Sequence, residues 1–150
     1  MQHRCCRKCL LKKRNVNLLF DKQNTRELNE QKAREYGKRI VDLLAAKQYK
    51  EIISAVDEID ESKDVETFEE DLSLFIEWYL DENQLKIEPY DTTAISDADE
   101  QERFFYNDED ENDLDFSYEY DLQDTDLTLM LDFIYEDGKY IVIFVDVHQL

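Results

Sequence analysis

The feature that most limits how this chain can fold is the acidic stretch NDEDENDLDFSYEYDLQDTD at residues 107–126, which contains no lysine or arginine. Segments with so much like charge are usually disordered. Here, however, acidic and apolar residues alternate, and side chains on a strand point to opposite faces with a period of two. The apolar set can therefore enter a core while the acids face outward. The sequence predicts a strand whose inward residues are Leu114, Phe116, Tyr118, Tyr120 and Leu122.

Charge is distributed very unevenly along the 150 residues, a length typical of one domain with a sizeable core. The first 20 residues carry six basic and no acidic side chains. The remainder has twelve basic against 38 acidic side chains, a formal charge of −26. Such a surface repels nucleic acid and anionic membranes and attracts basic partners. Solubility alone is the plainer explanation of the acidity.

The basic head holds all three cysteines, so we expect no disulfide in the rest of the chain. We expect residues 1–22 to be an N-terminal extension, open to disorder, and residues 23–150 to form a single acidic domain. Cys6 and Cys9 have the spacing of half a zinc site, but no second pair follows, so we expect no metal and no cofactor. No apolar run is long enough for a membrane span or a signal peptide, which favours a cytoplasmic location.

Three helices are predicted before the strands. Asn24 or Thr25 can cap the first helix, which should end near Ala46. A second helix is expected over residues 49–59, and a third after Asp64. The third is apolar around much of its circumference, so we expect it to be the central packing helix. Its apolar positions are Val65, Phe68, Leu72, Leu74, Phe75, Trp78 and Tyr79.

The strands are expected to form a mainly antiparallel sheet of about four members. The last strand is apolar on both faces, so it belongs in the middle of the sheet, with one face under helices and the other under a partner, a loop or a second copy. Three helices packed on one face of this sheet give an α+β domain. The strands are predicted at residues 85–88, 114–122, 127–135 and 140–147, with a tight Asp137-Gly138 turn between the last two.

Two longer segments carry a family resemblance. The stretch DLTLMLDFIYEDGKYIVIFVDVHQL, preceded by YGKRIVDLLAAKQYKEIIS, resembles a group of small acidic bacterial domains. The resemblance covers about residues 27–150 and leaves out the cysteine-bearing head. It implies a fold similar to the cone-shaped nuclear-transport-factor-like and cystatin-like folds. It also implies a role among the immunity proteins of bacterial toxin systems, including contact-dependent growth inhibition, but it provides no active-site motif.

Two patterns suggest other chemistry. Asp146 and His148 are two residues apart on the last predicted strand, so they should share a face and could form an acid/base pair lining a cavity. A small cavity-bearing enzyme or ligand binder is therefore the alternative function. Residues from Asp108 to Glu119 match much of the EF-hand calcium loop, but Asp113 occupies its glycine position and a strand, not a helix, should follow.

Non-catalytic binding is the function that the acidic strand favours. Its same-face acids would be about 6.7 Å apart, forming a firm ladder of charge. A toxin nuclease needs a basic groove to hold phosphates, and an acidic surface could occlude that groove after rapid electrostatic capture. We therefore predict an immunity protein that binds a basic toxin, while a nucleic-acid mimic and a homodimer remain open. The predicted contact residues are Phe105, Tyr106, Asp108, Asp110, Asp113, Asp115, Glu119 and Asp121.

Overall fold

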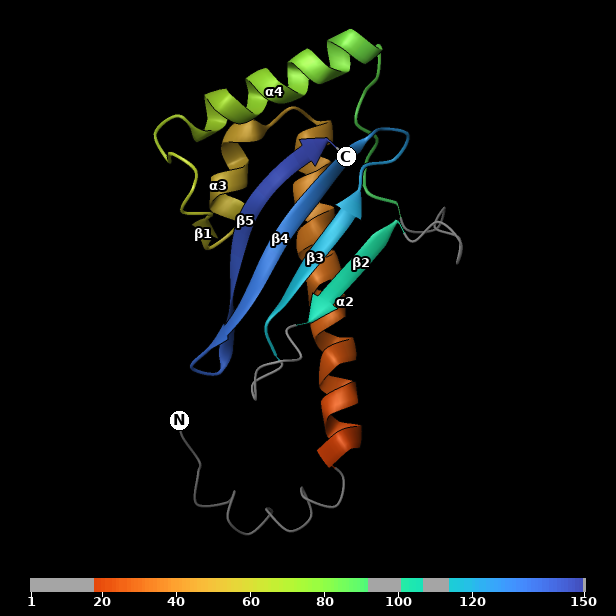
Figure 1. Cartoon of the computed structure of the whole chain (residues 1–150), viewed down its shortest axis with the longest axis vertical. Coiled ribbons are helices and arrows are strands. Elements are labelled where there is room, and N and C mark those ends of the chain that lie inside the picture. The colour runs from red at the N-terminus through yellow and green to blue at the C-terminus, as the bar shows by residue number, and fades with distance from the viewer. Residues whose placement is uncertain (1–17, 92–100, 107–113, 150) are drawn as a thin grey trace. The chain divides into compact units, whose positions relative to one another are not determined.

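The structure, a computed structural model, describes residues 18–91, 101–106 and 114–149, with side chains from Arg26 onward. The chain divides into two compact units between Lys32 and Ala33, and the second unit contains the described strands. The fold is α+β, with three N-terminal helices and a five-stranded sheet that is mixed but mostly antiparallel (Figure 1). The fold class predicted from the sequence is confirmed.

The first helix, α2 (Leu18–Ala45), begins earlier than predicted. Asn24 and Thr25 lie inside α2 and are not its cap, and the domain boundary expected at residue 22 also falls within it. Residues 18–32 contain neither glycine nor proline and are rich in good helix formers, so the helix continues upstream of the predicted cap. The predicted end is confirmed. It is closed by Lys47, whose φ of 59° lies in the left-handed region.

The second helix is much shorter than predicted. A 3-10 turn at Tyr49–Glu51 leads into α3 (Ile52–Ala55), after which the backbone becomes extended at Val56. Ile59, expected on this helix, instead belongs to the short strand β1 (Glu58–Ile59). The apolar residues up to Ile59 have helical spacing, but Glu58 and Ile59 pair in parallel with the last strand instead. Packing into the sheet outweighs the local preference for helix at these two residues.

The third helix, α4 (Phe68–Asn83), is not the central packing helix. Leu74 and Trp78 are 62% and 57% exposed, and Val65 lies before the helix and is 61% exposed. The central position belongs to α2, which from Ala33 onward runs behind the sheet in Figure 1. The completely or almost completely buried side chains of α2 are Ala33, Ile40, Val41 and Leu44.

The sheet has the strand order β1-β5-β4-β3-β2, with β1 parallel to β5 and the other neighbours antiparallel. The predicted strand at residues 85–88 is wrong, since that segment has no regular structure and Ile87 is buried without pairing. No strand was predicted at β2. The Asp137-Gly138 turn is confirmed, with φ angles of 51° and 84°. The remaining strands are β2 (Glu102–Tyr106), β3 (Phe116–Asp121), β4 (Leu127–Glu136) and β5 (Lys139–Gln149).

Aromatic contacts fill the core between the helices and the sheet. The rings of Phe116 and Phe133 stack with their centroids 4.8 Å apart, joining β3 to β4. Tyr36 of α2 meets Phe133 edge-on, and Phe68 of α4 meets Phe144 of β5 in the same way. Each of the two helices is thus anchored to the same face of the sheet by one aromatic pair.

Gly37 on α2 leaves room for the buried ring of Tyr118. A Cβ atom at position 37 would lie 2.7 Å from Cε2 of Tyr118, far inside ordinary contact. Alanine normally stabilises a helix by about 1 kcal/mol relative to glycine. Here we expect Gly37→Ala to lower the free energy of unfolding by roughly 1–3 kcal/mol, because the ring has nowhere to move. Urea denaturation measures this change.

A second background tests the cause of that loss. In a Tyr118→Leu variant the ring is missing, so Gly37→Ala should cost much less there than in the wild type. Equal losses in the two backgrounds would show that the helix, and not the ring, decides the effect.

Candidate functional site

The sheet has one face that carries no helix in the described part of the chain, and we call it the open face (Figure 1). Strand register determines which side chains lie on it, because alternate residues point to opposite faces. It is formed by Glu58, Arg103, Phe105, Asp115, Ser117, Glu119, Asp121, Thr128, Met130, Asp132, Ile134, Glu136, Lys139, Ile141, Ile143, Asp146 and His148.

The alternation predicted for the acidic strand is confirmed on β3. Phe116, Tyr118 and Tyr120 are at most 4% exposed and point toward the helices. Glu119 and Asp121 point to the open face and are only partly buried. The dense charge is compatible with folding because the same strand supplies a row of large core side chains.

A β-bulge places Asp146 and His148 on the open face. The partner of Leu131 is Phe144, whereas the partner of Met130 is Asp146, so Val145 is an extra residue in β5. Without it, Asp146 would point to the same side as the buried Phe144. The bulge reverses the alternation, and such re-aiming of side chains is a common use of bulges. The predicted shared face is confirmed, since His148 Nδ1 lies 2.7 Å from Asp146 Oδ1.

Arg103 already pairs with two of the acids that β3 presents. Its Nη1 and Nη2 donate to the two carboxylate oxygens of Asp121 at 2.9 and 2.7 Å, and its Nε donates to Glu119 at 3.2 Å. Thr128, fully buried, donates its hydroxyl to Asp121 at 2.8 Å. The predicted ladder of charge is therefore partly neutralised and held in place by bidentate hydrogen bonds.

The same contacts shift the pKa values of both partners. Hydrogen bonds to Asp121 raise the pKa of Arg103, although partial burial opposes this. Partial burial alone would raise the pKa of the Asp121 carboxyl, but the hydrogen bonds from Arg103 and Thr128 outweigh it and the pKa is lowered. Asp121 therefore stays ionised well into the acid range.

Acid titration should reveal the contribution of Asp121 to stability. Because its folded pKa is lowered, its contribution is present above the unfolded pKa of about 3.9 and disappears as the pH falls through the folded value. We expect Asp121→Asn to lower the free energy of unfolding by about 1–2 kcal/mol at pH 7. That difference should shrink below about pH 4 in urea titrations. A difference that does not change with pH would contradict the ionic role.

Two further carboxylates of the open face are also held by hydrogen bonds. Asp115 accepts from the backbone N–H of Tyr135 at 2.7 Å, and Asp132 accepts from the hydroxyl of Ser117 at 2.6 Å. Each interaction uses only part of the capacity of a carboxylate to accept hydrogen bonds. The acids are thus fixed in position but can still bind cationic groups.

Apolar side chains lie between these acids. Ile134, Ile141 and Ile143 occupy neighbouring positions on β4 and β5 and are half-buried. Phe105, at the β2 end of the face, is 51% exposed. An apolar centre with a polar border is the usual anatomy of a protein interface.

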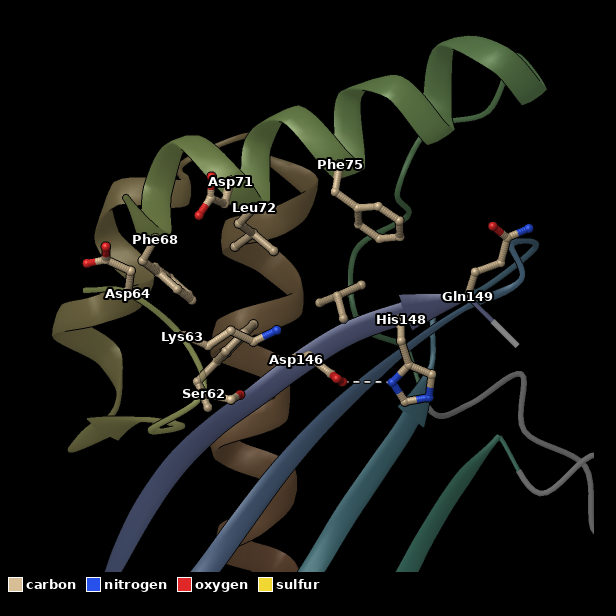
Figure 2. A pocket seen from close by; sticks show the side chains of 12 residues that line it. Ser62, Lys63, Asp64, Phe68, Asp71, Leu72, Phe75, Asp146, His148 and Gln149 are labelled. Carbon is tan, nitrogen blue, oxygen red and sulfur yellow. Dashed lines mark hydrogen bonds and ion pairs between the residues drawn. The ribbon is translucent and has the colours of Figure 1, made fainter. Parts of the chain in front are cut away.

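A cavity of about 550 Å³ lies beside the open face, between α4 and the end of β5 (Figure 2). Its floor is apolar, and its mouth carries Asp146 and His148 together with residues that precede or begin α4. We call this cavity the β5 groove. It is lined by Ser62, Lys63, Asp64, Phe68, Asp71, Leu72, Phe75, Phe144, Asp146, Val147, His148 and Gln149.

The predicted contact residues do not all come together. Phe105 shares the open face with Asp115, Glu119 and Asp121. Tyr106 points to the opposite face, where its ring packs 5.2 Å from that of Phe116. The other three predicted contacts, Asp108, Asp110 and Asp113, lie outside the described residues.

Sequence reasoning missed Arg103, Thr128 and Ser117, which hold the acids in place. Arg103 is the one arginine beside the acidic run, and its cross-strand position opposite Glu119 is visible only once β2 is known. Alternation within ERFFY could have given that signal, although five residues are few for a strand prediction.

Metal and membrane features are not found in the part of the chain that the structure describes. No group of three or more potential metal ligands occurs among those residues. The EF-hand-like stretch ends inside strand β3, which begins at Phe116, and no helix follows it, as expected. None of the described helices is long and apolar enough to cross a membrane. The cysteine cluster lies outside the described residues.

Comparisons of the chain with protein-family models, curated proteins and solved structures find no match.

Proposed function

We propose that the protein is a non-catalytic binding protein whose open face binds a basic protein, as an immunity protein binds its toxin. The observation that carries this proposal is a sheet face with five hydrogen-bonded carboxylates around an apolar centre. Among the described residues, the basic groups of that face are those of Arg103, Lys139 and His148. The five hydrogen-bonded carboxylates belong to Asp115, Glu119, Asp121, Asp132 and Asp146, and Glu58 and Glu136 add two exposed acids at the border of the face.

Preorganisation supports tight binding by this face. Each of these five carboxylates has a hydrogen-bonded partner. Ordering side chains on binding costs about 0.5–1.5 kcal/mol for each one immobilised. Because these side chains are already held, a cationic partner loses less free energy to ordering than it would on a surface of free glutamates.

A nuclease toxin is the partner whose chemistry fits best. Its groove must carry lysine and arginine side chains to hold a phosphate backbone. Carboxylates and the exposed Phe105 could occupy such a groove, with the aromatic ring as an anchor. The acidic charge of the whole chain would speed the encounter.

Capture of the partner from source cells, followed by association kinetics, tests the proposal. Asp115→Asn with Asp132→Asn removes two open-face charges while leaving amide oxygens that can accept the same hydrogen bonds. We expect this pair to slow association with the captured partner roughly tenfold at low salt. The control is Glu69→Gln with Glu70→Gln on α4, which makes the same change in net charge away from the open face. We expect this control pair to have little effect on the association rate.

Cell growth supplies a second measurement. Co-expression with the toxin encoded beside this protein should rescue growth, and the open-face pair should need more protein for the same rescue. Equal slowing by the two pairs would mean that net charge, and not the open face, recognises the partner. Rescue without a detectable complex would contradict direct binding.

The β5 groove favours a second candidate, a ligand binder that uses Asp146 and His148. Asp146 fixes the imidazole through Nδ1, so Nε2 is the atom that a ligand in the groove would meet. Asp146→Asn with His148→Gln should abolish such binding, whereas the Asp115 and Asp132 pair should leave it intact. Loss of partner binding by the Asp115 and Asp132 pair would instead support the open-face proposal.

A further inference from the structure

The outer edge of β5 is paired over only a short length. β1 contacts β5 at Ile143 and Phe144, and the last hydrogen bond of this pairing runs from Asp60 N–H to Phe144 O at 2.8 Å. Among the described residues, no strand pairs with the β5 edge beyond that point. The edge nevertheless continues to Gln149.

A turn takes the chain away from this edge. Asp60 accepts hydrogen bonds from Lys63 N–H through its carbonyl at 2.9 Å and from Ser62 N–H through its carboxylate at 3.2 Å. Side chains of aspartate often form turns of this kind with the backbone two residues on. The chain then proceeds to α4, so the edge beyond Phe144 faces the β5 groove.

Ladder geometry shows which backbone groups face the groove. Along a strand of an antiparallel pair, one residue directs its backbone N–H and C=O groups to the partner strand, and the next residue directs them away from it. Phe144 O is bonded on the β1 side, and the bulge then shifts the alternation by one residue. Asp146 and His148 therefore bond to β4, whereas Val147 and Gln149 direct their backbone groups to the groove.

The groove combines this edge with an apolar floor. Phe68, Leu72 and Phe75 lie on one face of α4, and Figure 2 shows Phe75 directed toward β5. Its volume of about 550 Å³ is within the usual range for ligand pockets. Strand edges beside such pockets bind extended peptides, because the backbone gives affinity and the pocket selects side chains.

The charge of the α4 wall indicates which peptide fits. Asp64 and Asp71 line this wall, and α4 contains six acidic residues and no basic one. Asp146 adds a third carboxylate at the mouth, against Lys63 and His148. A peptide with basic residues beside a large apolar side chain is therefore complementary to the groove.

We propose that the β5 groove binds an extended segment of a partner protein by strand addition to the edge at Val147 and Gln149, with a large apolar side chain on the Phe68–Phe75 floor and a basic residue beside Asp64 and Asp71. This site adjoins the open face at Asp146 and His148, but its strand edge and apolar floor lie outside that face, so the proposal does not depend on toxin binding.

Acetylated and amidated Lys-Val-X-Val-Lys peptides, with Phe, Leu, Trp or Tyr at X, test the proposal. NMR spectra of the full-length ¹⁵N-labelled protein should show saturable shifts at Val147, Gln149 and the inner face of α4. In the best-binding peptide, N-methylation of one alternate set of amides should weaken binding about tenfold, because those amides pair with β5. N-methylation of the other set should have little effect.

Two variants locate the binding site. Phe75→Ala should weaken binding about tenfold by shortening the apolar floor. Leu74→Ala changes an exposed neighbour on the same helix and should have no effect. The proposal is overturned if no peptide shifts Val147 at about 1 mM, a concentration at which even weak complexes form. The proposal is also overturned if N-methylation of either set of amides weakens binding equally, or if the Phe75→Ala variant binds the peptide as tightly as the wild type does.

Discussion

Replacement of Ile143 by lysine is expected to weaken binding of the captured basic partner by roughly 30- to 100-fold. Ile143 lies in the apolar centre of the open face. A lysine there would lose hydrating water in the contact, and its charge would repel the cations of the partner. The side chain is only half-buried and lies outside the core, so we expect a stability loss of about 1 kcal/mol. Titration calorimetry and urea denaturation measure the two effects.

Ile53→Lys is the matched control for this variant. Ile53 is 36% exposed and lies on α3, away from the open face. The Ile53→Lys substitution should lower the free energy of unfolding by a similar amount and leave partner binding unchanged. If both variants bind with wild-type affinity, the contact surface does not include the centre of the open face.

Strong local patterns allowed much of this fold to be predicted. The alternation over residues 114–122 placed Phe116, Tyr118 and Tyr120 in the core, and the Asp137-Gly138 turn joined β4 to β5 as expected. In each case one short segment contains the whole signal. The second half of the chain was therefore predicted better than the connections before it.

Features that depend on pairing between distant segments could not be predicted. The bulge at Val145 is not marked by glycine or proline, yet it decides which face holds Asp146 and His148. Arg103 meets Glu119 and Asp121 only because β2 pairs with β3. The candidate site therefore depends on tertiary register, whereas the acids themselves were visible in the sequence.

The helix pattern of α4 misled for a different reason. Apolar residues around most of a helix indicate burial on several sides, but Leu74 and Trp78 remain exposed. Because α2 already covers the centre of the sheet, α4 contacts the sheet through its inner face, with Phe68 packed against Phe144. Competition between two helices for one sheet face cannot be inferred from the pattern of either helix alone.

Arg34→Met is expected to cause the largest loss of stability among single changes of a charged residue. Glu102 points to the helix side of β2, and its side chain is only 11% exposed. Arg34 donates to it at 2.6 Å. Removing one partner of a buried ion pair usually costs about 3–5 kcal/mol, but Arg34 is 37% exposed and water can partly replace it. We therefore expect a loss of about 2 kcal/mol in urea denaturation.

The surrounding tyrosines explain why Glu102 needs that cation. Tyr118 and Tyr90 donate their hydroxyls to Glu102 at 2.9 and 3.3 Å. Burial raises the pKa of both hydroxyls, that of Tyr90 to about 12, so they remain neutral donors at pH 7. Their hydrogen bonds solvate the carboxylate only in part, and Arg34 supplies the balancing charge.

Glu102→Gln should rescue the Arg34→Met variant. The amide has no charge to balance, and its carbonyl oxygen can still accept from the two tyrosine hydroxyls. We expect the double variant to regain about 1 kcal/mol relative to Arg34→Met alone, with the coupling obtained from a double-mutant cycle. Additive losses would mean that Arg34 acts through its packing 5.2 Å from the ring of Phe104, and not through the charge of Glu102.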